Sequence, residues 1–174
     1  MLVKDRDFKE FVSADEIQTI VKRLAAKVDS DFEGKNPYYL VMMNGAFIFA
    51  ADFVRYLNHS ITLGCVKYTS YEGMHSTGSI TPVLPIPTNV KDRNVVLLED
   101  MVDTGQTMEF FLKEIAKFQP KSVTVVSLFS KPDVLNNRVK IDYLGMSLPN
   151  KFVVGYGLDY DGCGRNFPAL YYTE

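Results

Sequence analysis

The chain contains few residues that could hold a fold together through covalent or metal links. Its 174 residues include only two cysteines, Cys65 and Cys163, which lie far apart and outside any ligand-like spacing. This excludes a disulfide framework and a cysteine-based zinc site. A chain of this length buries roughly 70% of its unfolded surface, enough for one core without such links. We therefore expect a single domain over residues 1–174, in a reducing, cytoplasmic compartment.

The chain also lacks an excess of basic charge and a long apolar run. It has 19 Lys and Arg against 21 Asp and Glu, a net charge of −2, whereas domains that bind nucleic acid are usually strongly basic. The uncharged and mostly apolar stretch over residues 36–51 contains Pro37, Asn44 and Gly45 and is shorter than the roughly 18 apolar residues of a membrane helix. Residues 1–10 are too charged for a signal peptide. We expect neither nucleic acid nor membrane as a partner.

The hydrophobic pattern predicts alternating strands and helices. Ser13 and Glu16 form a capping box ahead of apolar residues at helical spacing, which predicts a helix over 14–29. Apolar runs predict strands at 38–43, 61–68, 94–98, 122–129, 141–144, 152–156 and 170–173, and buried helices at 46–57 and after 105. Small and polar residues predict a loop at 70–81. This order is typical of an α/β domain with a doubly wound, mainly parallel sheet flanked by helices, in which ligands bind beyond the carboxyl ends of the strands.

The strongest motif joins the strand at 94–98 to the helix that follows. The first turn of that helix carries Thr104, Gly105 and Thr107. The first N–H groups of a helix have no internal partner and carry positive partial charge, so they suit a phosphate, and glycine permits close approach of the backbone. The segment matches neither GxxxxGK[ST] nor GxGxxG. The pattern therefore indicates a phosphate site of another kind.

Two carboxylates, Glu99 and Asp100, stand next to this predicted phosphate site. They could bind magnesium or accept hydrogen bonds from sugar hydroxyls, and together with the amides they favour a ribose phosphate. A plainer interpretation is also open, in which Asp103 or Thr104 caps the helix and Glu99 and Asp100 are solvated charges at a strand end.

Two segments resemble those of the type I phosphoribosyltransferases. Residues 97–107, Leu-Leu-Glu-Asp-Met-Val-Asp-Thr-Gly-Gln-Thr, closely resemble the family's motif for 5-phosphoribosyl 1-pyrophosphate (PRPP). Residues 151–160, Lys-Phe-Val-Val-Gly-Tyr-Gly-Leu-Asp-Tyr, are similar to the purine-binding segment of the hypoxanthine-guanine branch. The resemblance runs from about residue 40 to 165. It implies the fold of that family, with a small hood formed by the chain ends.

The resemblance also implies an activity in purine salvage. The 5-phosphoribosyl group of PRPP would be transferred to hypoxanthine, and to guanine as well, to give IMP or GMP and pyrophosphate. Mg²⁺ is the implied cofactor, and a homodimer or homotetramer is the usual assembly.

Roles for individual residues follow from the same resemblance. Asp103 is the implied general base, and the 5′-phosphate cradle consists of Asp103, Thr104, Gly105, Gln106 and Thr107. The ribose is held by Glu99 and Asp100, the purine by Lys131, Phe152, Val153 and Asp159, and the pyrophosphate by Asn44, Gly45 and Arg165. The metal ligands are Glu99, Asp100 and Asp159, and Ser70 and Tyr71 begin a flexible lid.

Two positions depart from the family pattern. Asn44 and Gln106 stand where relatives often have lysine, so the pyrophosphate pocket and the phosphate cradle each lose a positive charge. Family members have a cis bond at the first of these positions, and we expect a cis Met43–Asn44 peptide.

Two other functions remain open from the residues. The first is a regulator of this fold that binds nucleotides and RNA, which the acidic balance of the chain disfavours. The second is a receiver-type signalling domain, which also carries acids at strand ends. That class needs an early acidic pair, and here the first buried strand ends in Met-Asn-Gly.

Overall fold

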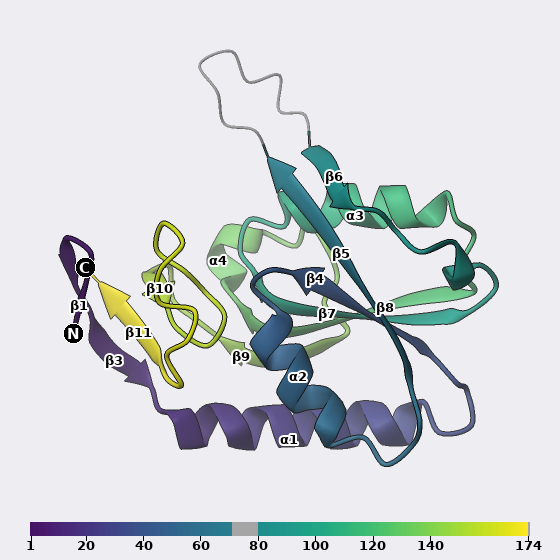
Figure 1. Cartoon of the computed structure of the whole chain (residues 1–174), viewed down its shortest axis with the longest axis horizontal. Coiled ribbons are helices and arrows are strands. Elements are labelled where there is room, and N and C mark those ends of the chain that lie inside the picture. The colour runs from purple at the N-terminus through teal and green to yellow at the C-terminus, as the bar shows by residue number, and fades with distance from the viewer. Residues whose placement is uncertain (71–79, 174) are drawn as a thin grey trace.

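A six-stranded sheet forms the centre of the computed structural model, which describes residues 1–70 and 80–173 (Figure 1). Its strands lie in the order β6-β5-β4-β7-β8-β9, and all neighbours are parallel except β5 and β6. Their bounds are β4 (Tyr38–Met43), β5 (Thr62–Ser70), β6 (Ile80–Leu84), β7 (Asn94–Val102), β8 (Ser122–Ser130) and β9 (Tyr143–Ser147). The predicted mainly parallel α/β sheet is confirmed.

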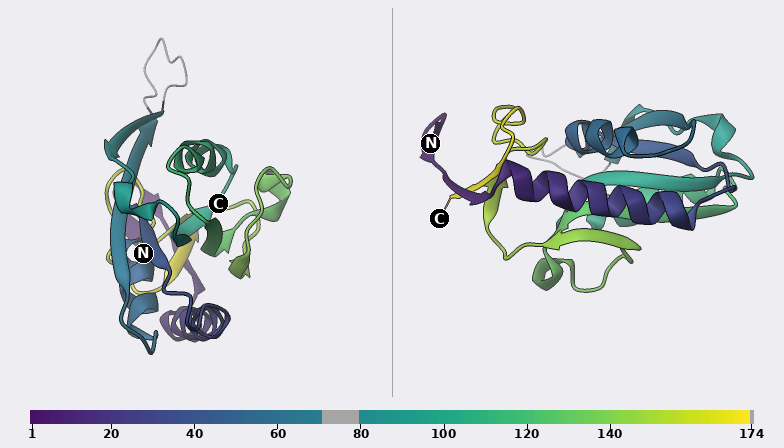
Figure 2. Two further views of the ribbon diagram at one scale, coloured as in Figure 1. Left: turned by 90° about the vertical axis from the view of Figure 1, so that its right-hand side faces the viewer. Right: turned by 90° about the horizontal axis from the view of Figure 1, so that it is seen from below.

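Helices cover both faces of this sheet (Figure 2). Helices α1 (Ala14–Asp31) and α2 (Phe47–Arg55) pack on one face, and α3 (Gln106–Ala116) and the short α4 (Pro132–Leu135) on the other; a 3-10 turn, η1, spans Thr88–Val90. Alternate residues of β4 pack against the helices on the two faces. Tyr39 and Val41 pack with α1 and α2, whereas Leu40 and Met42 pack with α3. In the described ranges no helix is long and apolar enough to span a membrane.

Helix α1 begins where the capping pattern predicted. The Ser13 hydroxyl accepts a hydrogen bond from the Glu16 amide at 3.3 Å. The buried residues recur every three or four positions and are Ile17, Ile20, Val21, Leu24, Ala25 and Val28, which form one apolar stripe against the sheet.

The two chain ends meet in a hood beside the carboxyl ends of the central strands (Figure 1). Its antiparallel sheet has the order β10-β11-β3, built from β10 (Phe152–Val154), β11 (Leu170–Thr173) and β3 (Lys9–Val12). A small hairpin of β1 (Leu2–Val3) and β2 (Arg6–Asp7) precedes it. The hood implied by the family resemblance is confirmed, although no sequence pattern marked its strands within residues 1–12.

Several predicted boundaries were wrong because strand pairing, not local pattern, sets them. Strand β7 continues to Val102, since Met101 and Val102 pair with β8, and β9 starts two residues later than predicted and runs on to Ser147 beside β8. The predicted loop at 70–81 is too long: Ser70 ends β5, and Ile80 and Thr81 belong to β6. Residues 71–79 lie outside the described part. Strand β10 stops at Val154 because Gly155 adopts φ 111°.

The order of the strands creates a switch point between β4 and β7. The chain passes from β4 outward to β5 on one side, and from β7 outward to β8 on the other. The loops that follow β4 and β7 therefore diverge at neighbouring strand ends, which is where open α/β sheets bind ligands.

Candidate active site

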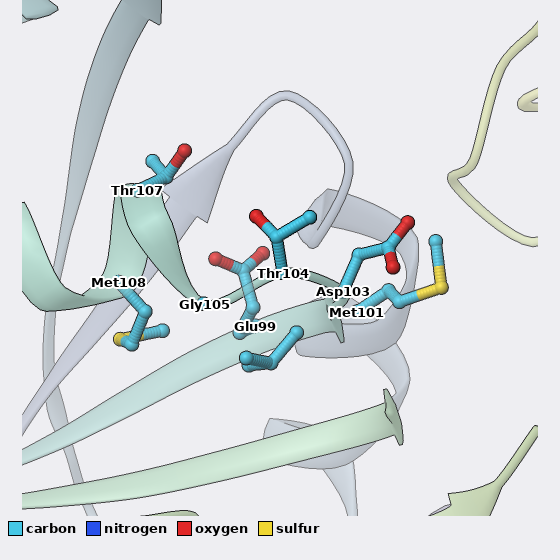
Figure 3. Close-up of a pocket in the computed structure, with 8 residues that line it drawn as sticks. Glu99, Met101, Asp103, Thr104, Gly105, Thr107 and Met108 are labelled. Atoms are coloured by element: carbon cyan, nitrogen blue, oxygen red, sulfur yellow. The ribbon is translucent and has the colours of Figure 1, made fainter. Parts of the chain in front are cut away.

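A pocket opens at the carboxyl end of β7 and at the start of α3 (Figure 3). Its cavity volume is about 120 Å³. Its lining residues are Glu99, Met101, Val102, Asp103, Thr104, Gly105, Thr107 and Met108. The PRPP-like motif thus surrounds one cavity, as expected. Met101 and Met108 are additional wall residues to which the sequence assigned no role at the site.

Backbone amides form one end of this pocket. Gly105 precedes α3 with φ 75° and has no side chain to cap the helix, while the Thr104 hydroxyl accepts a hydrogen bond from the Gln106 amide at 3.4 Å. A side chain at this glycine would meet Leu135 Cδ1 at 2.6 Å, so the backbone lies directly on the α3 side of the core. Thr104 and Thr107 are exposed at the same turn. This turn presents N–H groups and hydroxyls to a ligand, as a phosphate site requires.

Two buried carboxylates lie at the end of β7: Glu99 lines the pocket, and Asp100 lies next to Gly45. Glu99 is 9% exposed and Asp100 is 7% exposed, which contradicts the interpretation of both as solvated charges. Glu99 Oε1 accepts a hydrogen bond from the Asp100 amide at 3.1 Å, and Asp100 Oδ1 accepts one from the Met101 amide at 2.9 Å. Burial, and then the neighbouring Asp100 carboxylate, raise the pKa of Glu99 well above its usual range.

The same two carboxylates are suited to a divalent cation. Among the ion pairs of residues 1–70 and 80–173, none involves Glu99 or Asp100. In these ranges no three acidic, histidine or cysteine side chains converge on one metal position. Mg²⁺ commonly takes one or two protein carboxylates and completes its shell with phosphate oxygens and water. The donor set fits that partial shell.

An ion pair stands at the edge of the pocket. Lys131 Nζ lies 3.0 Å from Asp103 Oδ2, with the Lys131 side chain only 7% exposed and that of Asp103 41% exposed. Lys131 follows β8 and Asp103 follows β7, so two adjacent strand ends bring together residues that are 28 positions apart. A fixed cation and a more accessible carboxylate are placed side by side.

The loop after β4 completes the base of the site. The Met43–Asn44 peptide is cis, as predicted. A Cβ atom on Gly45 would lie 1.8 Å from Asp100 Oδ2, and one on Gly157 would lie 2.1 Å from the Gly45 carbonyl oxygen. The Gly45 backbone thus packs against the Asp100 side chain, and the Gly157 backbone of the hood packs against the Gly45 backbone. Neither contact leaves room for a methyl group.

The hood contributes another ion pair and an exposed ring. Arg165 Nη2 lies 2.7 Å from Asp159 Oδ1, and Arg165 Nη1 donates to the Gly157 carbonyl at 2.6 Å. Val153 is buried within β10, whereas Phe152 is 43% exposed. Asp159 and Arg165 therefore hold each other, and Phe152 has a free surface for a ligand.

A polar network that the sequence did not reveal ties the hood to the core. Tyr156 donates from its hydroxyl to Asp52 Oδ2 at 2.6 Å, and Gln18 Nε2 donates to the same oxygen at 2.7 Å. Asp52 lies on α2, Gln18 on α1 and Tyr156 in the hood. Tyr156 was visible only as part of the Gly-Tyr-Gly segment, and nothing in the pattern linked it to a helix more than 100 residues away.

Asp52 gives the hood attachment a defined pH dependence. Burial acts to raise its pKa, but hydrogen bonds from Tyr156, Gln18 and Arg55 outweigh burial and lower the pKa below 3.8. A carboxyl whose pKa is lower when folded stabilises the fold above its unfolded pKa, and that stability is lost as the pH falls through the folded value. In thermal melts, the Tm difference between the unmodified protein and Asp52→Asn should be largest above about pH 5 and shrink below about pH 4. A pH-independent difference would contradict this assignment.

The structure gathers most of the predicted site residues at one end of the sheet. Asn44 is exposed on the β4 loop, and Gln106 is exposed in the first turn of α3. The predicted lid is the exception: Ser70 is the last residue of β5, and Tyr71 lies outside the described residues.

Known proteins resemble this chain over nearly its entire length. Residues 9–161 match the family described as "Phosphoribosyl transferase domain". The chain is 35% identical over 163 residues to the hypoxanthine-guanine phosphoribosyltransferase of Lactococcus lactis, covering 93% of this chain and 88% of the relative. It is 33% identical over 169 residues to that of Streptococcus thermophilus, covering 95% and 93%.

Solved structures agree with these relatives. A crystal structure of a hypoxanthine-guanine phosphoribosyltransferase from Bacillus anthracis has a TM-score of 0.89 and 29% identity, covering 97% of this chain and all of the other. A hypoxanthine phosphoribosyltransferase from Staphylococcus aureus has a TM-score of 0.88 and 26% identity, covering 95% and 91%.

Proposed function

The chain belongs to the phosphoribosyltransferase family, and we propose that the pocket at the end of β7, together with the neighbouring β4 loop and hood, carries out the purine-salvage reaction of its hypoxanthine-guanine branch. The 5-phosphoribosyl group of PRPP is transferred to hypoxanthine or guanine. The bond from the anomeric carbon to pyrophosphate breaks, and a bond to N9 of the purine forms. The products are IMP or GMP and pyrophosphate.

The observation that carries the proposal is the Asp103–Lys131 pair beside the amides of α3. N7 and O6 are neighbouring positions on one edge of a 6-oxopurine. A pair of side chains 3.0 Å apart can meet both at once, with Lys131 donating to O6 and Asp103 accepting the N7 proton. Adenine has an amine at that position, so a fixed ammonium favours the 6-oxo bases. The purine stacks on Phe152, and the Val153 backbone reads its edge.

The remaining residues hold PRPP. The amides and hydroxyls of residues 104–107 bind the 5′-phosphate, with Gln106 as a neutral donor. Glu99 and Asp100 accept hydrogen bonds from the ribose hydroxyls. The Asn44–Gly45 amides and Arg165 contact pyrophosphate.

Mg²⁺ is part of the proposal, since neither buried carboxylate forms an ion pair with any of the described residues. Glu99 and Asp100 are the residues that would hold it, and Asp159 would reach it only through water. When bound, such an ion neutralises the charge that develops on the departing pyrophosphate. In the protein itself, Arg165 supports the same negative charge and holds Asp159 in place.

Three further elements complete the proposal. Ser70 and Tyr71 begin a segment that excludes water while the sugar carries positive charge. The protein works in the cytoplasm, in keeping with the two free cysteines. It assembles as a homodimer or homotetramer, which light scattering after size-exclusion chromatography would measure.

A turnover assay tests the function. With PRPP and magnesium, we expect activity on hypoxanthine and guanine and little on adenine, with xanthine as a further comparison. Equal or better use of adenine would contradict the role of Lys131. No turnover with any of these bases would contradict the proposed function.

Lys131→Met should weaken purine binding specifically. The substitution preserves most of the side-chain volume but removes the donor to O6, and a hydrogen bond from a charged group contributes about 1.5–3 kcal/mol. We expect the KM for hypoxanthine to rise about 10- to 100-fold, with a much smaller change in the KM for PRPP. Steady-state kinetics with each substrate varied in turn would measure this. Equal effects on both KM values would show that Lys131 serves the whole site and not the base.

A further inference from the structure

Three aromatic rings gather at the outer edge of the hood. The centroids of Phe152 and Tyr160 are 5.6 Å apart with an interplanar angle of 81°. Phe8 lies 6.2 Å from Phe152 and 6.1 Å from Tyr160. Phe8 is only 1% exposed, whereas Phe152 is 43% exposed. Phe152 is thus held by two rings and still has a free surface.

The amino-terminal hairpin fixes one of these rings from the other side. The Tyr160 hydroxyl donates to Asp5 Oδ1 at 2.8 Å, and the Arg6 guanidinium lies 5.1 Å from the Tyr160 ring centroid. Lys4 pairs with the adjacent Asp161. The hairpin is itself closed by the Phe8 amide, which donates to the Met1 carbonyl at 2.8 Å. Residues 4–8 therefore contact the 160–161 turn through four separate side chains.

That turn also carries a predicted ligand of the substrate. Tyr160 and Cys163 exchange backbone hydrogen bonds at 2.9 and 3.0 Å, and Asp159 Oδ2 accepts from the Gly162 amide at 2.7 Å. A displacement of Tyr160 would move Phe152 through the ring contact, whereas the Asp159 carboxylate is held separately by the Gly162 amide and Arg165.

We propose that Tyr160 and Phe8 are positioning residues for the purine, and that the amino-terminal hairpin holds them in place. This inference rests on the proposed function, because it requires Phe152 to stack on the base. A ring packed edge-on against Tyr160 and tilted against Phe8 is restricted in rotation, so the stacking surface is ordered before the purine arrives. Such preorganisation lowers the entropic cost of binding. Neither residue contacts PRPP in this account, so their effect should be confined to the base.

The test compares Tyr160→Leu with Tyr160→Phe. Aromatic pairs contribute about 0.5–1.5 kcal/mol beyond burial, so Tyr160→Leu should raise the KM for hypoxanthine about fivefold. We expect kcat and the KM for PRPP to stay within about twofold. Tyr160→Phe keeps the ring and should recover most of the loss. Asp5→Ala, at an exposed position, should reproduce a smaller part of it and provides the test if Tyr160→Leu does not fold.

Phe11→Leu is the matched control. Phe11 contacts Tyr172 in the same small sheet, at 5.3 Å between centroids, and has no ring contact with Phe152 among the described residues. The Phe11→Leu substitution should lower the Tm without changing the KM for hypoxanthine. Parallel changes in both KM values and kcat, or an equal rise in Phe11→Leu, would overturn the inference. Full activity in the unmodified protein with no effect in Tyr160→Leu would also overturn it and leave the proposed function intact. Absence of turnover in the unmodified protein would contradict the proposed function itself.

Discussion

Asp103→Asn is expected to lower kcat about 10²- to 10⁴-fold, the usual contribution of a general base. The amide keeps the size of the side chain and can still accept a hydrogen bond from Lys131 Nζ, 3.0 Å from the carboxylate it replaces. It cannot take the proton that the purine loses as it attacks. The fold should therefore survive, and the loss should appear in kcat rather than in the KM for PRPP. Steady-state kinetics with hypoxanthine, together with a thermal melt, would measure both.

Asp133→Asn is a suitable control for this prediction. Asp133 is exposed in the first turn of α4, two residues after Lys131, so the same chemical change is made close to the site but outside it. We expect its kcat to stay within about twofold of the unmodified protein. A kcat for Asp103→Asn within threefold of that of the unmodified protein would contradict the assignment of Asp103 as the general base.

Gly157→Ala is expected to disrupt the meeting of the three loops. The new Cβ would lie 2.1 Å from the Gly45 carbonyl oxygen, at a backbone φ of 102°. Backbone strain of this kind costs about 1–3 kcal/mol, and the clash must also separate the Gly157 segment from the Gly45 loop. Because a displacement of about 1 Å can cost 100-fold in rate, we expect kcat/KM for PRPP to fall at least tenfold and the Tm to drop.

Gly162→Ala separates these two causes. Gly162 also has a positive φ, 82°, but nothing lies within 4 Å of its added Cβ. Its substitution should lower the Tm through backbone strain alone and leave the KM for PRPP close to that of the unmodified protein. If both variants affected PRPP use equally, backbone strain in the hood would explain the result, and the contact with Gly45 would not.

Local pattern was sufficient for the elements that are buried on both sides. The run at β4 is continuous and apolar, β8 is rich in valine, and the capping residue and apolar stripe of α1 follow a standard pattern. The positions of all three elements were therefore confirmed to within a few residues. The end of β7 was wrong because Glu99 and Asp100 look like surface residues. Met101 and Val102 pair with β8, so the strand continues past both carboxylates to Val102.

The features of the candidate site also fall into two groups, those that a short segment of sequence predicted and those that depend on tertiary contacts. The amide turn at Gly105 could be predicted from residue types in one short segment, because helix start, glycine and threonines lie together in the chain. The roles of Asp103 and Lys131 came from family resemblance, but their ion pair was not predicted, because it depends on two strands lying side by side. The attachment of Tyr156 to Asp52, and of Tyr160 to Asp5, joins segments more than 100 residues apart, and no local signal marks such contacts.

The most direct test of the account is a crystal structure of the protein with IMP. We predict that the phosphate oxygens lie within hydrogen-bonding distance of the N–H groups of residues 104–107, with the ribose over Glu99 and Asp100 and the purine edge against Lys131. A well-ordered IMP bound elsewhere, with the turn at Gly105 free of phosphate, would contradict the central claim that these amides bind a sugar phosphate.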